Sequence, residues 1–430
     1  MTRVFKFGGA SIQDAAAIRH LGELLAGFPD RPLVVVVSAM GKTTNALEAL
    51  IAAAREGDEA DYRRRLEALR QAHLTVMTEL FGEGGGPAAR VAALFDELDA
   101  RHRQYRDASY PLHYDQTIGY GELLSTTLVA AWLDATGVAT TWCDARELVV
   151  TDACHQAANV DWAATARRVA DLPLEDGRLL LTQGFIGATP TGAMSSLGRE
   201  GSDFSAAILA HCLGAEEVVI WKDVPGLFNA DPRRFDNAVP LAHLSYAEAV
   251  ELAWHGAKVI HPKTLGPLQQ KAIPLTVRSF LEPGAPSSTI DAETRHDAAH
   301  PAFILRDDQV LLEVTPRDFA FMDEARLHDI LGRLVDVGLH ANLIDSEAMR
   351  LRLCVDPKPE KLDPLADSLA ADYRLDRHEG LTLLTVRHPT PALLEALAEG
   401  REVLAERGNA GTAQRLFRGD QCPETWHIPD

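Results

Sequence analysis

Short apolar runs alternate with segments of helical periodicity along the first two thirds of the chain. Leu33–Val37 and Val218–Trp221 are β-branched runs, which are typical of strands covered on both faces. Further strands are predicted at 4–7, 140–142, 179–182 and 274–279, and helices at 163–169 and 246–254. Such alternation predicts an α/β protein, an αβα sandwich around a mostly parallel open sheet. Residues 57–116 are charged and amphipathic, and we expect them to form a helical insertion beside a cleft.

The pattern changes beyond Glu282–Ser288, a Pro-, Gly- and Ser-rich stretch that is typical of a linker. From Gln309 to Arg377 the predicted order is strand, helix, strand, strand, helix, strand, a ferredoxin-like βαββαβ unit. A second unit begins at Leu381 but lacks its last helix and strand, and we expect an early strand at Phe303–Arg306 to complete it. The predicted domains are a first domain over 1–282, a linker over 283–300 and a paired region over 301–420. Its first unit covers about 308–378, and its second unit covers about 301–307 plus 380–419.

Composition narrows the range of partners and compartments. The 430 residues carry a formal net charge of −20, which argues against nucleic acid and anionic membranes as partners. The five cysteines are scattered and contain no C-x-x-C, which favours a reducing compartment and gives no zinc signature. The N-terminus lacks the apolar core of a signal peptide, and no run reaches the roughly 18 apolar residues of a membrane span. We therefore predict a cytoplasmic protein.

A glycine loop and helix dominate the stretch from Met194 to Arg234. Gly198 and Gly201 allow close approach of the backbone to a ligand, and Ser202 is a candidate N-cap. Asp203 falls in the first helical turn, either as a functional carboxylate or only as an anion that favours the helix dipole. The helix ends at Gly214, and polar residues follow the next strand, where open α/β sheets bind ligands.

The N-terminal strand leads into a second glycine turn. Lys6 precedes Gly8-Gly9, and it is either a cation for a phosphate or an exposed strand lysine. Ser11–Asp14 resembles a capping box that would open the following helix. G-K-T-T at 41–44 imitates the end of a P-loop, but Val36 stands where that motif needs its first glycine, so a P-loop NTPase is rejected.

Four blocks in the same order carry a family resemblance. They are KFGGAS at 6–11, SSLGREGSDFSAA at 195–207, WKDVPGLFNADPR at 221–233 and GAKVIHPKTL at 256–265. Together they resemble the aspartate kinases of the amino acid kinase superfamily, which carry C-terminal ACT domains. The resemblance implies transfer of the ATP γ-phosphoryl group to the side-chain carboxylate of L-aspartate, giving 4-phospho-L-aspartate. This reaction is the first step of lysine, threonine and methionine biosynthesis. Two alternatives remain open: another kinase of this fold, acting on glutamate, N-acetylglutamate or a nucleotide, or a non-catalytic amino-acid sensor.

The same resemblance assigns roles residue by residue. The catalytic residues would be Lys6 and Asp203. The substrate would be bound by Ser38, Thr44, Glu122, Arg199 and Ser202, although Glu122 alone could be a plain helix-terminal carboxylate. The nucleotide would be bound by Gly8, Gly9, Gly198, Asp223, Phe228, Arg233 and Lys258, with Mg²⁺ on phosphate oxygens and no dedicated protein metal site. His261 is expected to be structural. Because the aspartate side chain is already ionised, no general base is expected.

Regulation is also implied by the resemblance. An amino-acid effector, lysine or alternatively threonine, would bind at Asn342, Leu343, Ile344, Ser346 and Glu347. The other interpretation of this stretch is a buried strand edge without a ligand. ACT pairing implies a homodimer or a dimer of dimers, and we expect no fused homoserine dehydrogenase.

Three departures from the family pattern accompany the resemblance, namely Ala10, Glu200 and Lys222. Ala10 removes a hydroxyl, Glu200 replaces a glycine and so adds charge and bulk, and Lys222 replaces a threonine. None of them removes a residue assigned to catalysis, so they are typical of a divergent but active branch.

Overall fold

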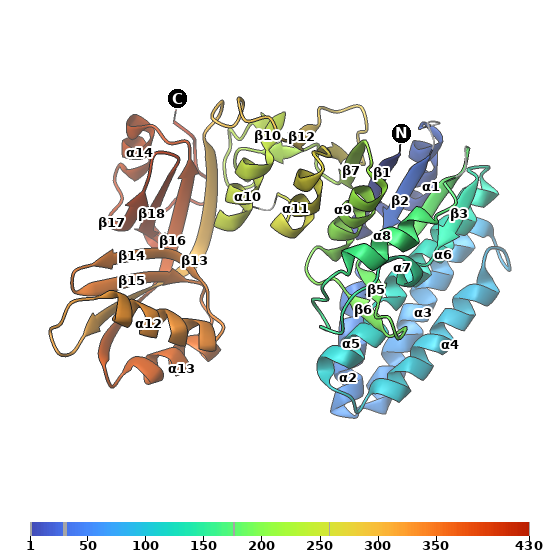
Figure 1. The fold of residues 1–430 in the computed structure, drawn as a ribbon, viewed down its shortest axis with the longest axis horizontal. Coiled ribbons are helices and arrows are strands. Elements are labelled where there is room, and N and C mark those ends of the chain that lie inside the picture. The colour runs from blue at the N-terminus through green and yellow to red at the C-terminus, as the bar shows by residue number, and fades with distance from the viewer. Residues whose placement is uncertain (1, 29–31, 175–176, 258, 430) are drawn as a thin grey trace. The chain divides into compact units, whose positions relative to one another are not determined.

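The computed structural model describes residues 2–28, 32–174, 177–257 and 259–429. They form two compact units (Figure 1). The first comprises Met1–Leu227, Ala242–Tyr246 and Ile260–Glu293, and the second comprises Phe228–Leu241, Ala247–Val259 and Thr294–Asp430. This division differs from the predicted linear boundaries because segments 228–241 and 247–259 pack with the C-terminal region. The Phe303 N–H, for example, donates to the Asn229 carbonyl at 2.6 Å.

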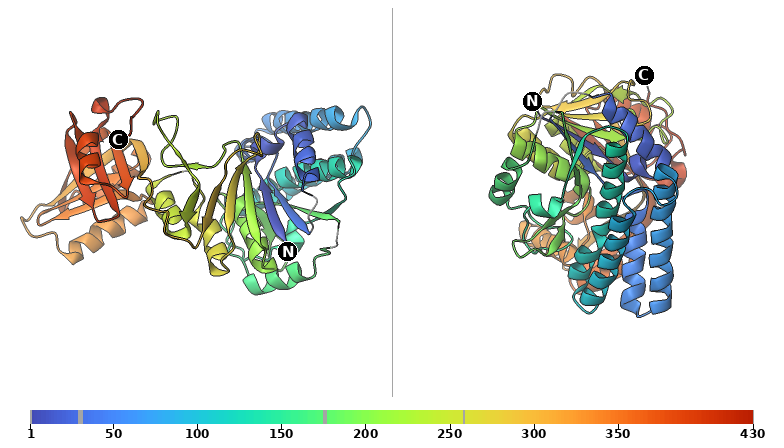
Figure 2. Two further views of the ribbon diagram at one scale, coloured as in Figure 1. Left: turned by 90° about the horizontal axis from the view of Figure 1, so that it is seen from above. Right: turned by 90° about the vertical axis from the view of Figure 1, so that its right-hand side faces the viewer.

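The first unit is built on an eight-stranded sheet with the order β10-β12-β11-β7-β1-β2-β4-β3. The central strands β1 (Arg3–Phe7), β2 (Leu33–Val37), β4 (Leu179–Gln183) and β7 (Glu217–Lys222) are parallel to their neighbours. Figure 2 shows the N-terminal strands in blue beside the green β7, although β7 is far away in sequence. The mostly parallel sheet predicted from the sequence is confirmed.

At one edge of this sheet, the structure differs from the prediction made from the sequence. One edge is β3 (Thr140–Cys143), and the other is formed by β11 (Leu275–Ser279), β12 (Ser288–Asp291) and β10 (His243–Ser245). β12 runs antiparallel to β11 and lies inside the stretch 283–300 that was predicted to be a linker. That prediction was wrong for 288–291, because neighbouring strands on both sides satisfy the backbone of this short segment.

Helices cover both faces of the sheet. α1 (Ala15–Ala26) and α6 (Tyr120–Ala135) pack on the face that carries Phe5, Phe7 and Trp221. α9 (Gly201–Leu213) contacts β1, β2 and β7, and α11 (Pro262–Gln270) packs against α9. Two small helices, α7 (Ala145–Leu148) and α8 (Trp162–Ala170), and the short strands β5 (Ile186–Ala188) and β6 (Met194–Ser196) complete this part.

The predicted insertion is helical and forms a layer of long helices beside the sheet (Figure 1). Residues 57–116 contain α3 (Glu59–Phe81), α4 (Ala88–Tyr105) and most of α5 (Tyr110–Ile118), and α2 (Thr43–Glu56), which precedes the predicted insertion, packs with them. Their apolar faces form a second core in which Leu66, Phe95 and Leu98 pack together with residues of α6. The insertion is therefore fixed to the eight-stranded sheet through α6.

Two predicted helix starts were wrong. Asp14, and not the Ser11–Asp14 capping box, caps α1: its side chain accepts from the Ala17 N–H at 2.9 Å, after a short 3₁₀ turn over Gly9–Ile12. Ser202 is not the N-cap of α9, because the helix begins at Gly201 and its N-cap is Glu200, two residues before Ser202 and in the left-handed conformation. Asp203 lies in the first turn and Gly214 ends the helix, as predicted.

The second unit contains a six-stranded antiparallel sheet with the order β14-β15-β13-β16-β18-β17. Its strands are β13 (Ala302–Pro316), β14 (Ala341–Glu347), β15 (Arg350–Val355), β16 (Tyr373–Arg387), β17 (Val403–Gly408) and β18 (Thr412–Arg418). The helices α12 (Glu324–Asp336), α13 (Pro359–Leu369) and α14 (Pro391–Ala398) pack on it, and α10 (Tyr246–His255) joins this unit from Ala247 onward.

The paired organisation of this region arises from two long strands. The predicted strands at 303–306 and 309–314 are one strand, β13, with a register shift between Arg306 and Gln309. Its early half pairs with Leu383–Val386, as predicted for the segment that completes the second unit.

Of the helices in the described residues, none combines the length and apolarity that a bilayer crossing requires.

Candidate active site

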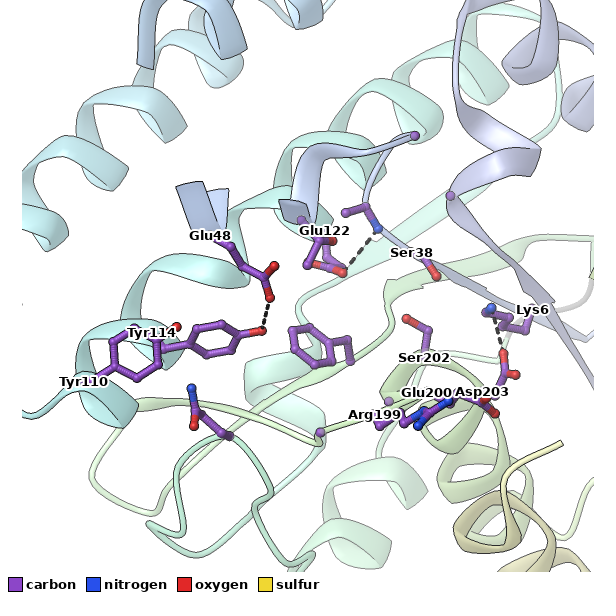
Figure 3. A pocket seen from close by; sticks show the side chains of 18 residues that line it. Lys6, Ser38, Glu48, Tyr110, Tyr114, Glu122, Arg199, Glu200, Ser202 and Asp203 are labelled. Carbon is purple, nitrogen blue, oxygen red and sulfur yellow. Dashed lines mark hydrogen bonds and ion pairs between the residues drawn. The ribbon is translucent and has the colours of Figure 1, made fainter. Parts of the chain in front are cut away.

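A cavity of about 520 Å³ opens at the carboxyl ends of the central strands of the first unit. Lys6 lies in β1, Ser38 follows β2, and Glu122 lies in the first turn of α6. Arg199, Ser202 and Asp203 come from the loop before α9 and from its first turn, and Asp203 lies beside Lys6 (Figure 3). Residues far apart in the sequence thus meet where parallel sheets commonly bind ligands.

At one end of the cavity, Lys6 and Asp203 form an ion pair. The Lys6 Nζ lies 2.7 Å from an Asp203 carboxylate oxygen, and their side chains are only 12% and 6% exposed. Removal of either partner would leave a buried charge without compensation, which is strongly unfavourable. The pair fixes a cation beside the glycine turn, with Gly9 also lining the cavity.

The part of the cavity away from this pair, called its other end, contains Glu122, which is in the opposite state (Figure 3). Its side chain is 3% exposed, one carboxylate oxygen accepts from the Ala39 N–H at 3.3 Å, and the other oxygen is buried with no hydrogen-bond partner among the described residues. Burial raises the pKa of this carboxyl to about 8. A buried carboxylate oxygen that faces a cavity fits a cationic ligand group.

The loop before α9 reaches into the cavity because two glycines permit it. Gly198 has a φ of +78°, a conformation that side chains rarely adopt. Gly184, directly after β4, lies against Ser202, and a Cβ atom there would come within 2.5 Å of the Ser202 Cβ. This contact holds the start of α9 against the sheet, while the guanidinium of Arg199 remains exposed at the cavity.

One wall of the cavity was not predicted from the sequence. It comprises Glu48, Tyr110, Tyr114, Gln156 and Phe185. The Tyr114 hydroxyl donates to the Glu48 carboxylate at 3.2 Å, and burial raises the pKa of Tyr114 well above its ordinary range. The i, i+4 spacing of Tyr110 and Tyr114 in the insertion was the only sequence signal.

Most of the predicted site residues lie together, but several do not. Lys6, Gly9, Ser38, Thr44, Glu122, Gly198, Arg199, Ser202 and Asp203 line the cavity. Gly8 lies next to it, since a Cβ atom on Gly8 would be 3.5 Å from the Lys6 Nζ. Asp223 follows β7 at the same edge of the sheet but lies outside the cavity-lining set of the described chain.

Three more residues were predicted to bind the nucleotide, and none of them is among the described residues of the first unit. Phe228 and Arg233 belong to the second unit, where Arg233 is exposed and pairs with Asp231 at 2.7 Å. Lys258 lies outside the described residues. His261 caps α11, since its ring nitrogen accepts from the Lys263 N–H at 3.1 Å, which agrees with the structural role predicted for it.

The second unit has a cavity of its own, of about 390 Å³. Three of the predicted effector residues, Asn342, Leu343 and Ile344, line it together with Trp254 and Arg407. Ser346 and Glu347 lie elsewhere, exposed at the end of β14, where Glu347 pairs with Arg352 at 2.9 Å. The predicted effector strand is thus divided between a cavity and an exposed hairpin.

The chain is similar to known proteins over most of its length. The model of the amino acid kinase family matches residues 1–279. The chain is 30% identical over 392 residues to the lysine-sensitive aspartokinase 3 of Escherichia coli, with 89% of this chain and 86% of that protein covered. It is 29% identical over 386 residues to an Arabidopsis thaliana chloroplastic bifunctional aspartokinase/homoserine dehydrogenase, covering 87% of this chain but only 42% of that protein.

Solved structures agree with these matches. E. coli aspartokinase III in complex with lysine and aspartate superimposes with a TM-score of 0.83 at 28% identity, covering 97% of this chain and 96% of that one. The same enzyme in complex with aspartate and ADP gives a TM-score of 0.80 at 29% identity, covering 98% and 97%. The chain therefore belongs to the amino acid kinase family.

Proposed function

We propose that the protein is an ATP-dependent aspartate kinase, which transfers the γ-phosphoryl group of ATP to the side-chain carboxylate of L-aspartate. The observation that carries this proposal is the cavity with a buried, incompletely bonded carboxylate at one end and a buried lysine at the other. An amino acid with an anionic side chain presents both complements, an ammonium group and a negative charge. The aspartokinases among the relatives, one of them solved in complex with aspartate and ADP, support this choice of acceptor.

Glu122 binds the α-ammonium group of aspartate in this mechanism. The bound cation stabilises the ionised form of a carboxyl whose pKa burial otherwise raises to about 8. Arg199 offers a planar, bidentate grip on a substrate carboxylate, and Ser38, Thr44 and Ser202 line the same space. The substrate is thereby oriented with its side chain toward Lys6.

The reacting carboxylate attacks the γ-phosphorus, a new P–O bond forms, and the bond between the γ-phosphorus and the β–γ bridging oxygen breaks to release ADP. No proton has to be removed from the nucleophile, so the barrier is mainly electrostatic, because two anions must meet. Lys6 opposes this repulsion at the transferring group, and Asp203 holds the lysine in place at 2.7 Å. Gly9 and Gly198 leave room for the phosphates.

Mg²⁺ would accompany the nucleotide. No three acidic, histidine or cysteine side chains come together as a metal site in the part of the chain that the structure describes. We therefore propose that Mg²⁺ is held mainly by phosphate oxygens and water, where it neutralises phosphate charge.

We further propose a cytoplasmic location and regulation by an amino acid, lysine or alternatively threonine, through the cavity of the second unit. Asn342, Leu343 and Ile344 line that cavity, and a lysine-sensitive relative supports the choice of effector. Pairing of the regulatory regions in a homodimer or dimer of dimers completes the proposal. An effector that weakens aspartate binding must itself bind less tightly when aspartate is present.

The direct test is ADP release with saturating ATP and Mg²⁺ and one acceptor at a time: aspartate, glutamate or N-acetylglutamate. We expect turnover with aspartate at least about a hundredfold above the other acceptors, because a shifted carboxylate loses alignment with the γ-phosphorus. Equal or greater turnover with another acceptor would replace aspartate as the substrate. Background ADP release with every acceptor, together with amino-acid binding by calorimetry, would instead indicate a non-catalytic sensor.

A further inference from the structure

Two contacts, which the sequence did not predict, tie the glycine loop after β6 to the start of α11. The Glu200 carboxylate accepts from the backbone N–H of His261 at 3.0 Å. The Lys263 Nζ donates to the backbone carbonyl of Leu197 at 3.0 Å. These contacts bracket Gly198 and Arg199, which line the active-site cavity together with Glu200 itself.

Glu200 makes its contact from a costly backbone conformation. Its φ is +54°, in the left-handed region that favours glycine. Glycine would adopt this turn more easily, yet the position carries a side chain that reaches the next segment. Backbone strain held at a site is a reason to look for a function of the residue that bears it.

Lys263 is the second residue that contacts this loop. Its ammonium group lies 4.7 Å from the centre of the Phe204 ring, which belongs to the first turn of α9. Burial lowers the pKa of Lys263 below its ordinary value. The residue therefore contacts both the loop and the helix that the loop opens.

We propose that Glu200 and Lys263 are positioning residues that preorganise the glycine loop for the phosphates of the nucleotide. This inference rests on the proposed kinase function. A glycine-containing loop loses conformational freedom when it closes on a ligand, and a loop that is already held loses less. Each contact has a backbone atom at one end, the His261 N–H before α11 or the Leu197 carbonyl in the loop, so together they fix the loop against the start of α11.

The expected consequence is weaker binding of the nucleotide. Loss of either contact weakens ATP binding about fivefold, the effect of one net hydrogen bond. The turnover number at saturating ATP stays within about twofold, because the chemical step is made by other residues. The KM for aspartate rises by no more than the KM for ATP, and any rise reflects Arg199, which belongs to the same loop. Glu200→Gly removes the carboxylate and also relieves the left-handed backbone, so the variant has no reason to misfold.

The experiment compares Glu200→Gly, Glu200→Gln, Lys263→Met and the double variant with the natural protein. The readouts are kcat, the two KM values and ADP binding by calorimetry. Glu200→Gln keeps an oxygen that can accept from the His261 N–H, and it should restore ATP affinity to within about twofold. Lys271→Met, at the exposed far end of α11, is the matched control and should change nothing.

An unchanged KM for ATP and unchanged ADP affinity in Glu200→Gly and Lys263→Met would overturn the inference. So would an effect of Glu200→Gln as large as that of Glu200→Gly, because the charge and not the contact would then matter. Failure of the proposed function looks different: the natural protein would release no ADP with aspartate. ADP calorimetry would still test the two contacts in that case.

Discussion

The two ends of the active-site cavity differ in how a buried ionisable group is compensated. At one end, Lys6 and Asp203 neutralise each other at 2.7 Å before any ligand arrives. At the other end, Glu122 has an oxygen without a partner among the described residues, and burial raises the pKa of its carboxyl to about 8. One end is already compensated, and the other is compensated only when a cation binds.

This difference separates two tasks. A paired lysine stays in a fixed position, as stabilisation of a short-lived, highly charged transferring group requires. An unpaired carboxyl gains most when it receives a cationic ligand, so it favours recognition of the acceptor. The comparison predicts that variants at the two ends fail in different kinetic parameters.

The largest effect is expected for Lys6→Met. Loss of the cation at the transferring group should lower kcat by about 10²- to 10³-fold, as for loss of one oriented donor at a transition state. The KM for aspartate should change much less. The measurement is steady-state ADP release, with far-ultraviolet circular dichroism to show that the variant folds.

Lys42→Met, at an exposed lysine before α2, is the matched control and should retain full activity. A kcat of Lys6→Met within a few-fold of the natural protein would remove Lys6 from the chemical step. The two ends of the cavity would then not differ in the way proposed.

Glu122→Gln should have the next largest effect, and this effect should be on the KM for aspartate. Loss of a charged partner for the ammonium group should raise the KM for aspartate about 10- to 100-fold. The KM for ATP should remain nearly unchanged, since Glu122 lies at the opposite end from Lys6. Glu48→Gln in the same cavity is the comparison variant and should raise the KM for aspartate less, because Glu48 is exposed and already accepts from Tyr114.

The pH dependence of stability gives a smaller effect with a definite sign. Burial raises the pKa of Glu122 from 4.5 to about 8, so between these values the unfolded chain is ionised while the folded chain keeps the proton. The unfolded state then binds fewer protons, and the free energy of unfolding falls as pH rises from about 4.5 to 8. Below this window the contribution is fully present.

Thermal unfolding without ligands, measured between pH 5 and pH 8, tests this expectation. Over this range the melting temperature of the natural protein should fall further than that of Glu122→Gln, which has no titrating carboxyl at this position. Saturating aspartate should reduce the difference. Parallel curves for the two proteins would show that Glu122 titrates normally.

The smallest expected effect is a proton released on binding. At pH 7 a carboxyl with a pKa of about 8 is mostly protonated, and an incoming ammonium group would expel close to one proton per aspartate bound. Calorimetry in two buffers with different ionisation enthalpies measures this number. A value near zero would mean that Glu122 is already ionised or does not meet the ammonium group.

The sequence predicted those parts of the molecule that depend on local pattern. Apolar β-branched runs such as Leu33–Val37 form central strands, and glycines mark the turns that follow them. Lys6 and Arg199 were assigned through the four family blocks and Glu122 through the wider family resemblance, and the fold brings them to one cavity. A parallel sheet accounts for this meeting, since the carboxyl ends of its strands lie at one edge.

Other features depend on contacts between distant segments and had no local signal. β12 is a four-residue strand in a polar stretch, and only its neighbours make it a strand. The link between Glu200 and His261 ends on a backbone N–H, which every non-proline residue possesses. The wall of Tyr110 and Tyr114 depends on how the helical insertion docks on α6.

The most direct test of the central claim is to trap the product. The natural protein is incubated with ATP, Mg²⁺, aspartate and hydroxylamine, which captures an acyl phosphate as a hydroxamate, in parallel with Lys6→Met and Glu122→Gln at limiting aspartate. We predict aspartyl hydroxamate in amounts equal to the ADP released, and strongly reduced formation in both variants. ADP release without hydroxamate, or undiminished hydroxamate formation in both variants, would contradict the account.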